Sequence, residues 1–447
     1  MDKIWAKAAE GLLSAGSLEK MAGESVTLHG MVQRIRRLGW GAFIVMRRHD
    51  GLLQCVIGNE GNEKLLEKLS EEQCAELSGT LQEADIKDAS INPSTVELQV
   101  DSGRIIHDPE VRPSVDLAKK VLDLHIDTNL DLRPLSLRHP MERARLKVSE
   151  ALTRAFRGYL YDQGFTEIHT PKICVAGAEG GANIFTVEYF DRKAFLAQSP
   201  QFYKQMGVAI YERVTEIGPV FRAEPHQTSR HVNEYTSLDL EMGFISGQED
   251  VMAMEMGYIR KALQLLRRDY SYQLQLLDVN LPEPPDWIPS ITLRDAHEIA
   301  GEMLEEDFSD EPDLEPVEEK AVCRYFLESE GCEFVFVTHF PREKRPFYAM
   351  DDPQTPGDTL SFDLLFRGLE ITTGGQRIHD YDMQVEKLRR FGLDPNEFES
   401  YLMAHKFGLP PHGGLAIGLE RFTARLLDVE NIRLTTMFPR DVKRLTP

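Results

Sequence analysis

The chain has 447 residues, about three times the usual single-domain length, so two or three domains are expected. Hydrophobic residues make up 42% and charged residues 28% of it, which excludes a mainly disordered, collagen-like or membrane-embedded protein. Lysine and arginine number 51 against 73 aspartates and glutamates, a net charge of −22. Such a charge argues against a surface that binds polyanions without preference, so any contact with nucleic acid must use local basic patches.

The five cysteines form no CxxC pair and are too sparse for a disulfide framework or a zinc site. This usage favours a reducing compartment. The N-terminus has no apolar core long enough for a signal peptide, and nowhere do about 18 apolar residues run uninterrupted. We therefore expect a cytoplasmic protein that does not span a membrane.

The N-terminal part is expected to form a small β-domain. Residues 4–21 fit a short amphipathic helix, and the β-rich runs after it are broken by Gly, Asp and Asn. We predict a barrel within residues 1–110, a hinge or linker over residues 111–140 and a larger domain over residues 141–447. The linker prediction depends on the lack of periodicity and on four prolines, Pro109, Pro113, Pro134 and Pro140.

The larger domain opens with a helical pattern, because Leu152, Phe156 and Leu160 recur every fourth residue, and the strand-like segment GFTEIHTPKI follows. Further along, an acidic stretch near residues 300–320 is interpreted as a solvated insertion, since nothing in it fixes the geometry that a metal site needs. Its acidic residues are Glu302, Glu305, Glu306, Asp307, Asp310, Glu311, Asp313, Glu315, Glu318 and Glu319.

The predicted barrel carries a local basic patch. If AFIVMRRHDGLLQCV is an antiparallel hairpin that turns near Asp50, any register with an odd index sum places Phe43 and Gln54 on one face. Phe43 can then stack on an unpaired base, and Gln54 can hydrogen-bond to its edge. The alternative is that Phe43 belongs to the core and the arginines form a solvated rim. The patch consists of Arg34, Arg36, Arg37, Arg47 and Arg48.

A second cluster lies in FRAEPHQTSRHVNEYTSLDLEMGF, where a predicted strand ends in a polar loop and another strand follows. Arg222, Glu224, Arg230 and His231 fall within ten positions there. Arginines can grip a phosphate with paired donors, and the ring of Tyr235 can stack on a purine. The alternative is an ion-pair network between these arginines and the acidic residues of the second strand.

Near the C-terminus, the glycine-rich segment GGLAIGL leads to Glu420 and Arg421 at the start of a predicted helix. Glu370 and Thr373 offer hard oxygen ligands of the kind that Mg²⁺ takes when it is shared with substrate phosphates. Close packing explains a glycine-rich strand equally well. Since GLAIGL lacks the GxGxxG and GxxxxGK[ST] patterns, neither a Rossmann nor a P-loop site is indicated.

Taken in order, these segments resemble class II aminoacyl-tRNA synthetases, and more closely the aspartyl-tRNA synthetase family of the short archaeal and eukaryotic type. GFTEIHTPKI is similar to the first class II motif, FRAEPHQTSRH to the second and GLAIGLER to the third. The match covers nearly the whole chain, and three ordered motifs are far more specific than any one. The ending FPRDVKRLTP is also similar to that subgroup, while the HIGH and KMSKS signatures of class I are absent.

This resemblance implies an α+β fold: an N-terminal five-stranded OB barrel that reads the anticodon, and a catalytic domain with an antiparallel sheet flanked by helices. Its anticodon contacts would be Arg34, Phe43 and Gln54, and the first motif would form a homodimer interface. The implied function is that of an aspartate–tRNA ligase, which activates L-aspartate with ATP to aspartyl-adenylate and transfers it to the 3′-terminal adenosine of tRNA(Asp).

The resemblance also implies an ATP site. Arg222 would hold the α-phosphate and the substrate carboxylate, Tyr235 would lie under the adenine, and Arg421 would lie on its other side. Together with Glu370, these two arginines would be the catalytic residues, which align the reactants and neutralise the charge that develops at phosphorus. The other implied ATP contacts are Glu224, Arg230, His231, Val232, Gly418 and Glu420. Mg²⁺, the implied cofactor, has three candidate ligands: Glu370, Thr373 and, more weakly, Asp363.

Charge distinguishes aspartate from asparagine as the substrate. Gln201 and Lys204 match the aspartate-binding QxxK of the aspartyl group, and Arg377 matches its side-chain carboxylate clamp. Each charge-assisted bond is worth roughly 1.5 to 3 kcal/mol, and an amide cannot accept it through its NH₂. We expect Lys204→Met to abolish aspartate-dependent pyrophosphate exchange while sparing the fold, although Lys204 alone would fit an exposed helix lysine. The other implied aspartate contacts are Glu179, Ser199, Arg222, Thr373 and Asp239. Of these, Asp239 would support Lys204.

Three residues depart from the family pattern: Ala416 in the third motif, and Gln33 and Arg48 in the barrel. The barrel changes bear on the choice of tRNA, because the aspartate and asparagine anticodons differ at the last base read. The chain can therefore be an enzyme that places aspartate on tRNA(Asn) as well, and this alternative stays open. Two others stay open too: an asparaginyl enzyme, which Lys204 disfavours, and a catalytically silent tRNA-binding paralogue, which Arg222, Glu370 and Arg421 disfavour.

Overall fold

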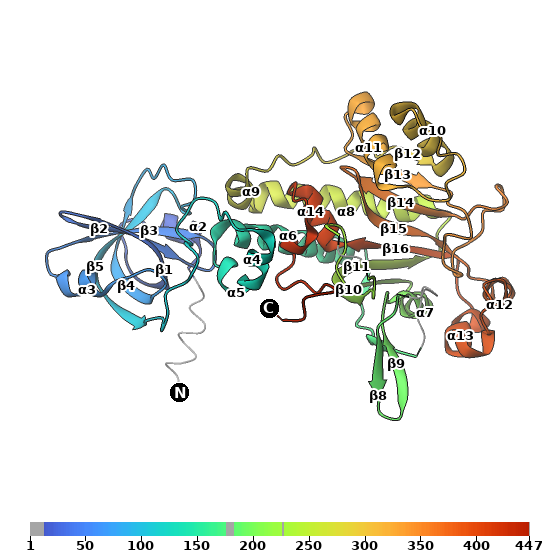
Figure 1. Cartoon of the computed structure of the whole chain (residues 1–447), viewed down its shortest axis with the longest axis horizontal. Coiled ribbons are helices and arrows are strands. Elements are labelled where there is room, and N and C mark those ends of the chain that lie inside the picture. Colours follow the sequence, from blue (N-terminus) through green and yellow to red (C-terminus); the bar gives the residue numbers. More distant parts are fainter. Residues whose placement is uncertain (1–12, 176–182, 226–227, 447) are drawn as a thin grey trace. The chain divides into compact units, whose positions relative to one another are not determined.

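The computed structural model describes residues 13–175, 183–225 and 228–446, and Figure 1 shows its helices and strands. The chain divides into two compact units. Unit 1 comprises Met1–Ala144 and Gln275–Asp278, and unit 2 comprises Arg145–Leu274 and Val279–Pro447. Of the helix expected over residues 4–21, the described part is α2 (Ala15–Lys20).

Unit 1 contains a closed barrel with the strand order β1-β2-β3-β5-β4. Alternating burial along β4 shows why the segment is a strand, since every second side chain enters the core. Ile44, Cys55 and Leu98 are fully buried there. The predicted five-stranded barrel is therefore confirmed. Its elements are β1 (Ser25–Leu38), β2 (Gly41–Arg47), β3 (Leu52–Gly58), α3 (Glu63–Lys68), β4 (Cys74–Glu83) and β5 (Val96–His107).

The segment expected as a linker contains two short helices, α4 (Ile126–Asp131) and α5 (Arg133–Ser136). Arg133 is fully buried and forms an ion pair of 2.8 Å with Glu142 and a hydrogen bond of 3.0 Å to the Asn129 side chain. A buried charge needs such partners, so this part of the chain has a defined structure.

Unit 2 is built on an eight-stranded sheet with the order β12-β13-β14-β15-β16-β11-β10-β6. The six central strands pair antiparallel, as expected, whereas β12 and β6 pair parallel to their neighbours at the two edges. The strands are β6 (Thr166–Glu167), β10 (Arg213–Phe221), β11 (Glu234–Gly243), β12 (Ser290–Thr292), β13 (Phe334–Thr338), β14 (Ser361–Phe366), β15 (Leu369–Arg377) and β16 (His412–Gly418).

Helices pack on this sheet and against each other. Leu152, Phe156 and Leu160 of α6 are fully buried, which confirms the helical pattern, and the rings of Phe156 and Tyr258 meet edge to face at 5.0 Å. The helices are α6 (Pro140–Asp162), α7 (Gln201–Tyr211), α8 (Gln248–Asp269), α9 (Ser271–Leu277), α10 (Leu293–Leu304), α11 (Pro316–Glu330), α12 (Tyr381–Arg390), α13 (Glu399–Phe407) and α14 (Leu419–Leu426).

The segment GFTEIHTPKI forms two separate short strands rather than the one expected. β6 pairs with β10 of the large sheet, whereas β7 (Ile173–Cys174) pairs with β9 (Arg192–Leu196) of a three-stranded sheet that also contains β8 (Thr186–Tyr189). Pro171 lies between them and has no N–H to donate to a ladder, so a continuous strand is unfavourable. In Figure 1 the β8–β9 hairpin projects away from the large sheet.

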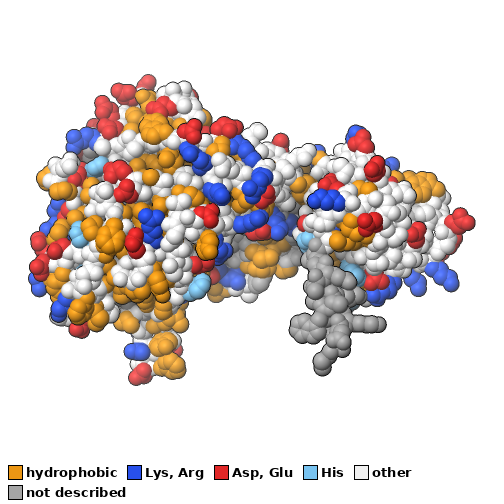
Figure 2. All heavy atoms as spheres, turned by 180° about the vertical axis from the view of Figure 1, so that it is seen from behind, with side chains coloured by type: hydrophobic (Ala, Val, Ile, Leu, Met, Phe, Trp, Pro, Cys, Tyr) orange, Lys and Arg blue, Asp and Glu red, His pale blue; other side chains and the backbone are white. Residues whose placement is uncertain are grey.

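The acidic stretch near residues 300–320 runs from the end of α10 into the first turn of α11. Figure 2 shows acidic side chains gathered at the top of unit 2. The expectation of a solvated stretch holds for most of them but is wrong for Glu318, which is fully buried, and for Glu319, which is 6% exposed. Glu318 accepts a hydrogen bond of 2.7 Å from the Nδ1 of His297 in α10. Two packed helices therefore draw these carboxylates inward.

The five cysteines are free, which agrees with the absence of a disulfide framework in the sequence. Within the part of the chain that the structure describes, none of the helices combines the length and the apolar character that crossing a membrane requires.

Candidate functional site

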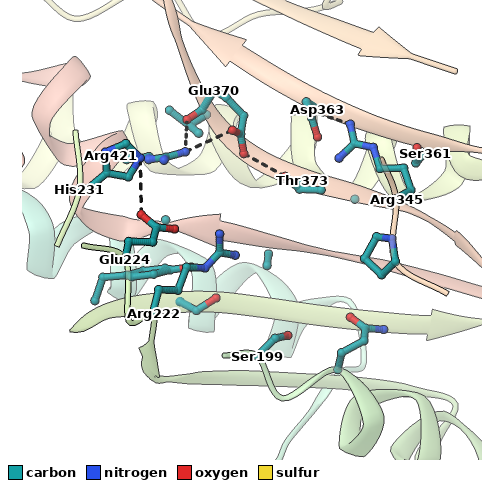
Figure 3. A pocket seen from close by; sticks show the side chains of 18 of the residues that line it. Ser199, Arg222, Glu224, His231, Arg345, Ser361, Asp363, Glu370, Thr373 and Arg421 are labelled. Atoms are coloured by element: carbon teal, nitrogen blue, oxygen red, sulfur yellow. Dashed lines mark hydrogen bonds and ion pairs between the residues drawn. The ribbon is translucent and has the colours of Figure 1, made fainter. Parts of the chain in front are cut away.

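A cavity of about 330 Å³ opens on one face of the sheet in unit 2 (Figure 3). Side chains reach it from β11, β14 and β15, from the loop after β10 and from the start of α14, so segments distant in sequence converge. Arg222 and Arg421 approach it from opposite sides. The residues predicted for ATP, aspartate or metal that line it are Ser199, Gln201, Arg222, Glu224, Arg230, His231, Val232, Tyr235, Asp363, Glu370, Thr373, Arg377, Gly418, Glu420 and Arg421.

Glu370 connects Arg421 of α14 to Thr373 of its own strand, β15. It accepts a hydrogen bond of 3.2 Å from Arg421 through Oε2 and one of 2.9 Å from the Thr373 hydroxyl through Oε1. Desolvation raises the pKa of Glu370, but Arg421, Thr373, Arg345 and Arg222 outweigh it, so the pKa lies below its usual value. An ionised carboxylate at this position is suited to bind a cation.

Asp363 faces the same cavity from β14, directly opposite Thr373 in the strand register. Its Oδ2 accepts a hydrogen bond of 2.7 Å from Arg345, while its buried Oδ1 has no hydrogen-bond partner among the described residues. Burial and the charge of Glu370 raise the pKa of Asp363 to about 7, although Arg345 acts to lower it. A buried acceptor without a donor, beside a second carboxylate and a hydroxyl, fits a hard divalent cation.

Within the described residues, no group of three or more His, Cys, Asp and Glu side chains is placed to hold a metal ion. The donor set at the predicted metal site is instead two carboxylates, Asp363 and Glu370, and the hydroxyl of Thr373. Mg²⁺ commonly takes one or two carboxylates and completes its shell with waters and substrate phosphates. These residues therefore fit the implied metal, and their assignment as ligands stays a prediction.

The loop after β10 supplies the cationic side of the cavity. The guanidinium of Arg222 lies over the ring of Tyr235, 5.8 Å from its centroid. His231 Nε2 lies 3.7 Å from a carboxylate oxygen of Glu224, and the two are drawn together in Figure 3. Arg230 forms an ion pair with Glu319 of α11. Arg222 lines the cavity, as predicted for a residue that binds a ligand.

Glu420 fixes the beginning of α14. The backbone N–H of Thr236 in β11 donates to both carboxylate oxygens of Glu420, at 3.0 and 3.1 Å. Burial raises the pKa of Glu420 to about 7, against the lowering effect of these hydrogen bonds. The interaction connects β11 to α14, and it thereby places Arg421 over the cavity.

At the other end of the cavity, Lys204 and Arg377 converge on one carboxylate of the chain itself, Glu241. Arg377 Nε lies 3.1 Å from Glu241 Oε1, and Lys204 Nζ lies 3.5 Å from Oε2 and 2.8 Å from an oxygen of Asp239. Gln201 also donates to Glu241 at 3.2 Å. Three residues of the predicted aspartate site, Lys204, Arg377 and Asp239, therefore form a network of two cations and two anions with Glu241.

Lys204 is fully buried, so it is not the exposed helix lysine that the residue alone suggested. Neither Lys204 nor Asp239 lines the cavity, whereas Arg377 does. The 2.8 Å ion pair agrees with a supporting role for Asp239. Glu179 lies outside the described residues. The roles of these residues in binding aspartate stay predictions.

Sequence reasoning missed several side chains at the cavity. Arg345 lies over the ring of Phe340, 3.7 Å from its centroid, and binds Asp363. Glu241 was seen as part of a strand but not as the acceptor shared by Lys204 and Arg377. The segment FPREKRPFY, with its dense cations, carried the available signal for Arg345. Other lining residues that were not predicted are Ser237, Asp313, Lys344, Tyr348 and Ser361.

In the barrel, the register pairs Phe43 with Val56 and Val45 with Gln54. This odd index sum places Phe43 and Gln54 on one face, as predicted, and both are half-buried and outside the barrel core. Phe43 packs edge to face against the exposed Trp40 at 5.5 Å. An aromatic ring and an amide on an outer face can bind a base, and their role in anticodon binding stays a prediction.

The predicted basic patch is smaller than expected. Arg34, which forms an exposed ion pair of 2.8 Å with Asp88, remains at the surface with Arg36 and Arg37. Including Arg47 and Arg48 was wrong, since they are 7% and 9% exposed. Arg47 binds Glu72 with two hydrogen bonds of 2.8 Å, and Arg48 donates to the backbone oxygen of Leu13.

Gln33, one of the departures from the family pattern, is buried and accepts a hydrogen bond from Arg47, while its amide donates to the backbone oxygen of Leu117 at 2.5 Å. Arg48, the second departure in the barrel, also turns inward. Both side chains therefore contact unit 1 itself rather than present a face to a ligand.

Comparisons with known proteins agree with this arrangement. The family model of class II tRNA synthetases (D, K and N) matches residues 125–442, and that of the OB-fold nucleic acid binding domain matches residues 26–106. An aspartate–tRNA(Asp/Asn) ligase of Deinococcus radiodurans is 44% identical over 96% of this chain and 97% of its own length. An aspartate–tRNA(Asp) ligase of Pyrococcus abyssi is 38% identical over 96% and 98%.

Among solved structures, asparaginyl-tRNA synthetase from Pyrococcus horikoshii, complexed with asparaginyl-adenylate, has a TM-score of 0.86 and 28% identity. The match covers 98% of this chain and all of that one. The two chains therefore share their fold, barrel and sheet included, over nearly the full length. The chain belongs to the class II tRNA synthetases, in the group of D, K and N enzymes.

Proposed function

We propose that this chain is an aminoacyl-tRNA ligase that activates L-aspartate with ATP and transfers it to the terminal adenosine of tRNA(Asp). The observation that supports it most is the single cavity lined by Arg222, Glu370, Arg377 and Arg421. Cations at both ends of one cavity suit a substrate that carries a side-chain carboxylate and a co-substrate that carries a triphosphate. Full-length similarity to aspartate–tRNA ligases agrees with this proposal.

In the proposed reaction, the α-carboxylate oxygen of aspartate attacks the α-phosphorus of ATP, and pyrophosphate leaves. The terminal ribose hydroxyl of tRNA then attacks the carbonyl carbon of the mixed anhydride, and AMP leaves. Arg222 and Arg421 reach the cavity from opposite sides, so both can contribute to neutralising charge on the α-phosphate. Mg²⁺, when bound by Glu370, Thr373 and Asp363, would add positive charge at the phosphates.

Specificity for aspartate would come from the network around Glu241. Arg377 lines the cavity, and its guanidinium is oriented by Glu241. Lys204 contributes a second positive charge to the network, in which Asp239 and Glu241 balance the two cations. A substrate carboxylate that meets this end gains charge-assisted hydrogen bonds, which the amide of asparagine would lose.

We further propose that tRNA(Asn) is a second acceptor, because two of the relatives, from Deinococcus radiodurans and Thermus thermophilus, are aspartate–tRNA(Asp/Asn) ligases of 44% and 42% identity. The test is charging of purified tRNA(Asp) and tRNA(Asn) with labelled aspartate. We expect both to be charged. Charging of tRNA(Asp) alone would contradict the second acceptor and leave the ligase proposal standing, whereas no charging of either would contradict both.

The similarity to an asparaginyl-tRNA synthetase complexed with its adenylate favours a second candidate, an asparagine–tRNA ligase. The same charging experiment with labelled asparagine separates the two. A homodimer formed through the first motif and a cytoplasmic location remain predictions of the family resemblance.

A further inference from the structure

The acidic stretch of α10 and α11 reaches the proposed ATP site. Glu319 lies in the first turn of α11, is 6% exposed, and accepts a charge-assisted hydrogen bond from Arg230, which lies 89 positions earlier. We propose that Glu319 is a positioning residue: it holds the Arg230 guanidinium at the cavity, ready for the triphosphate of ATP. The inference rests on the proposed function, since that function assigns Arg230 to ATP.

Arg230 needs such a support because of where it is placed. It lies in the loop between β10 and β11 and keeps 21% of its side chain exposed. A long side chain on a loop loses much conformational freedom when it binds a ligand, and a partner that orients it beforehand reduces that loss. A buried carboxylate is an effective partner, because its bond to a guanidinium is strong and directional.

Glu319 is itself held rigidly. The first turn of α11 has Pro316 and a reciprocal capping box, in which Glu315 and Glu318 each accept from the backbone N–H of the other. Glu318 is anchored by His297 of α10 at 2.7 Å. The N-terminal end of a helix also stabilises a negative charge. Glu319 is therefore a fixed anion against which Arg230 is aligned.

The electrostatic surroundings of Glu319 are those of the cavity rather than of the outer surface of α10 and α11. The pKa of Glu319 lies above its usual value, because burial and the charge of Glu370 raise it more than Arg230 and Arg421 lower it. These neighbours are residues of the proposed ATP site. Asp313, from the same acidic stretch, lines the cavity as well. The stretch thus contributes to the site although most of its carboxylates face solvent.

A matched control lies on the same helix. Glu328 forms an ion pair of 2.7 Å with Arg324, and both side chains are exposed, at 60% and 70%. Glu328→Gln removes the same charge from α11 and breaks the same type of pair, but it lies at the opposite end of the helix from Glu319. Any effect of lost helix charge in general appears in this variant too.

The experiment compares the full chain with its Glu319→Gln and Glu328→Gln variants. ATP affinity is measured by calorimetry, and the KM for ATP and for aspartate by pyrophosphate exchange. We expect Glu319→Gln to weaken ATP binding of the folded chain roughly 3- to 10-fold, as the loss of one pre-oriented side chain predicts, with the KM for aspartate unchanged. Glu328→Gln should match the original chain. Unchanged ATP binding by Glu319→Gln would overturn the proposal. Tighter binding would overturn it too, because it would mean that Glu319 competes with the triphosphate for Arg230.

A double variant tests that Glu319 acts through Arg230. Arg230→Gln alone should weaken ATP binding, and adding Glu319→Gln to it should change the affinity no further. If the two effects multiply instead, Glu319 acts independently and the inference is wrong. Should Glu319→Gln fail to fold, Glu319→Asp takes its place, because it keeps the charge but withdraws the carboxylate from Arg230. Since calorimetry needs no turnover, absence of aspartate-dependent exchange in the original chain would contradict the proposed function without affecting this comparison.

Discussion

Lys204 is a lysine with no exposed surface, and its ammonium lies 2.8 Å from Asp239 and 3.5 Å from Glu241. From sequence we expected Lys204→Met to spare the fold. Its burial changes that expectation, because the substitution leaves two carboxylates in the interior without this cation. Removing one partner of a buried pair costs about 3 to 5 kcal/mol.

We therefore predict that Lys204→Met lowers the free energy of unfolding by about that amount, measured with urea at pH 7. Lys261→Met, which alters an exposed lysine of α8, is the control and should leave the stability unchanged within about 0.5 kcal/mol. A Lys204→Met variant as stable as the original chain would mean that the buried network does not depend on its ammonium. Since unfolding alone also removes activity, exchange by this variant is compared with that of the original chain per amount of folded protein.

Glu255 of α8 is a buried acid behind the sheet, where it accepts a hydrogen bond from the Thr372 hydroxyl. Burial raises the pKa of Glu255 from 4.5 to about 8, against the effect of Thr372, and the charge of Asp363 raises it further. Between these two values the folded chain keeps a proton that the unfolded chain has lost. Stability from this group is thus greatest below pH 4.5 and falls by ~1.4 kcal/mol per pH unit up to about pH 8.

Glu255→Gln should therefore reduce the loss of stability between about pH 5 and pH 8, measured by urea unfolding at each pH. The free energy of unfolding of the variant minus that of the original chain should therefore be larger at about pH 8 than at about pH 5. Glu249→Gln, an exposed glutamate of the same helix, should follow the original pH dependence. A difference between Glu255→Gln and the original chain that does not change with pH would show that Glu255 does not keep its proton on folding.

At the scale of the element, β16 lies between β11 and β15, and its glycines differ in the space around them. A Cβ at Gly414 would lie 2.1 Å from Glu241 Oε2 and 2.2 Å from the Leu240 backbone oxygen, whereas a Cβ at Gly418 would meet nothing closer than 3.7 Å. The first contact is impossible without displacing the strand or Glu241. The second is ordinary van der Waals contact.

We predict that Gly414→Ala destabilises the chain by at least about 1 to 3 kcal/mol, the usual cost of overpacking, and lowers the melting temperature. Gly418→Ala should leave the melting temperature unchanged. Thermal unfolding of both variants, followed by circular dichroism, provides the comparison. Equal melting temperatures would contradict the close approach of Glu241 to β16.

Elements with strong local patterns could be predicted from sequence. The buried face of α6 follows from Leu152, Phe156 and Leu160, and the glycine-rich strand that leads into Arg421 is β16 followed by α14. The division of GFTEIHTPKI between two sheets could not be predicted, because it depends on which neighbour each half pairs with. The inward turn of Glu318 and Glu319 depends likewise on the packing of α10 against α11.

At the scale of the molecule, the second and third motifs predicted one side of the cavity, since they carry Arg222, Arg230 and Arg421 with their neighbouring carboxylates. What they could not reveal are partners from segments outside the motifs. Glu319 meets Arg230 across 89 positions, and Arg345 meets Asp363 across 18. Glu241 lies next to the second motif, but its shared bond to Lys204 and Arg377 requires three strands and a helix to be in place.

The chain carries a net charge of −22, yet the proposed substrates are anions. This is consistent with a local reversal of charge, since six lysine and arginine side chains line the cavity against five aspartates and glutamates. Within a cavity, nearby fixed charges act on the ligand more strongly than distant surface charges, which salt screens over about 8 to 10 Å. The selectivity of this cavity for a carboxylate is therefore the central claim.

The most direct test is ATP–pyrophosphate exchange by the full chain with L-aspartate and L-asparagine in parallel. We predict exchange with aspartate that exceeds exchange with asparagine by a factor of at least about 100, because a site built for a charged group rejects the analogue that lacks it. Exchange with asparagine equal to or faster than exchange with aspartate, or no exchange with either amino acid, would contradict the account.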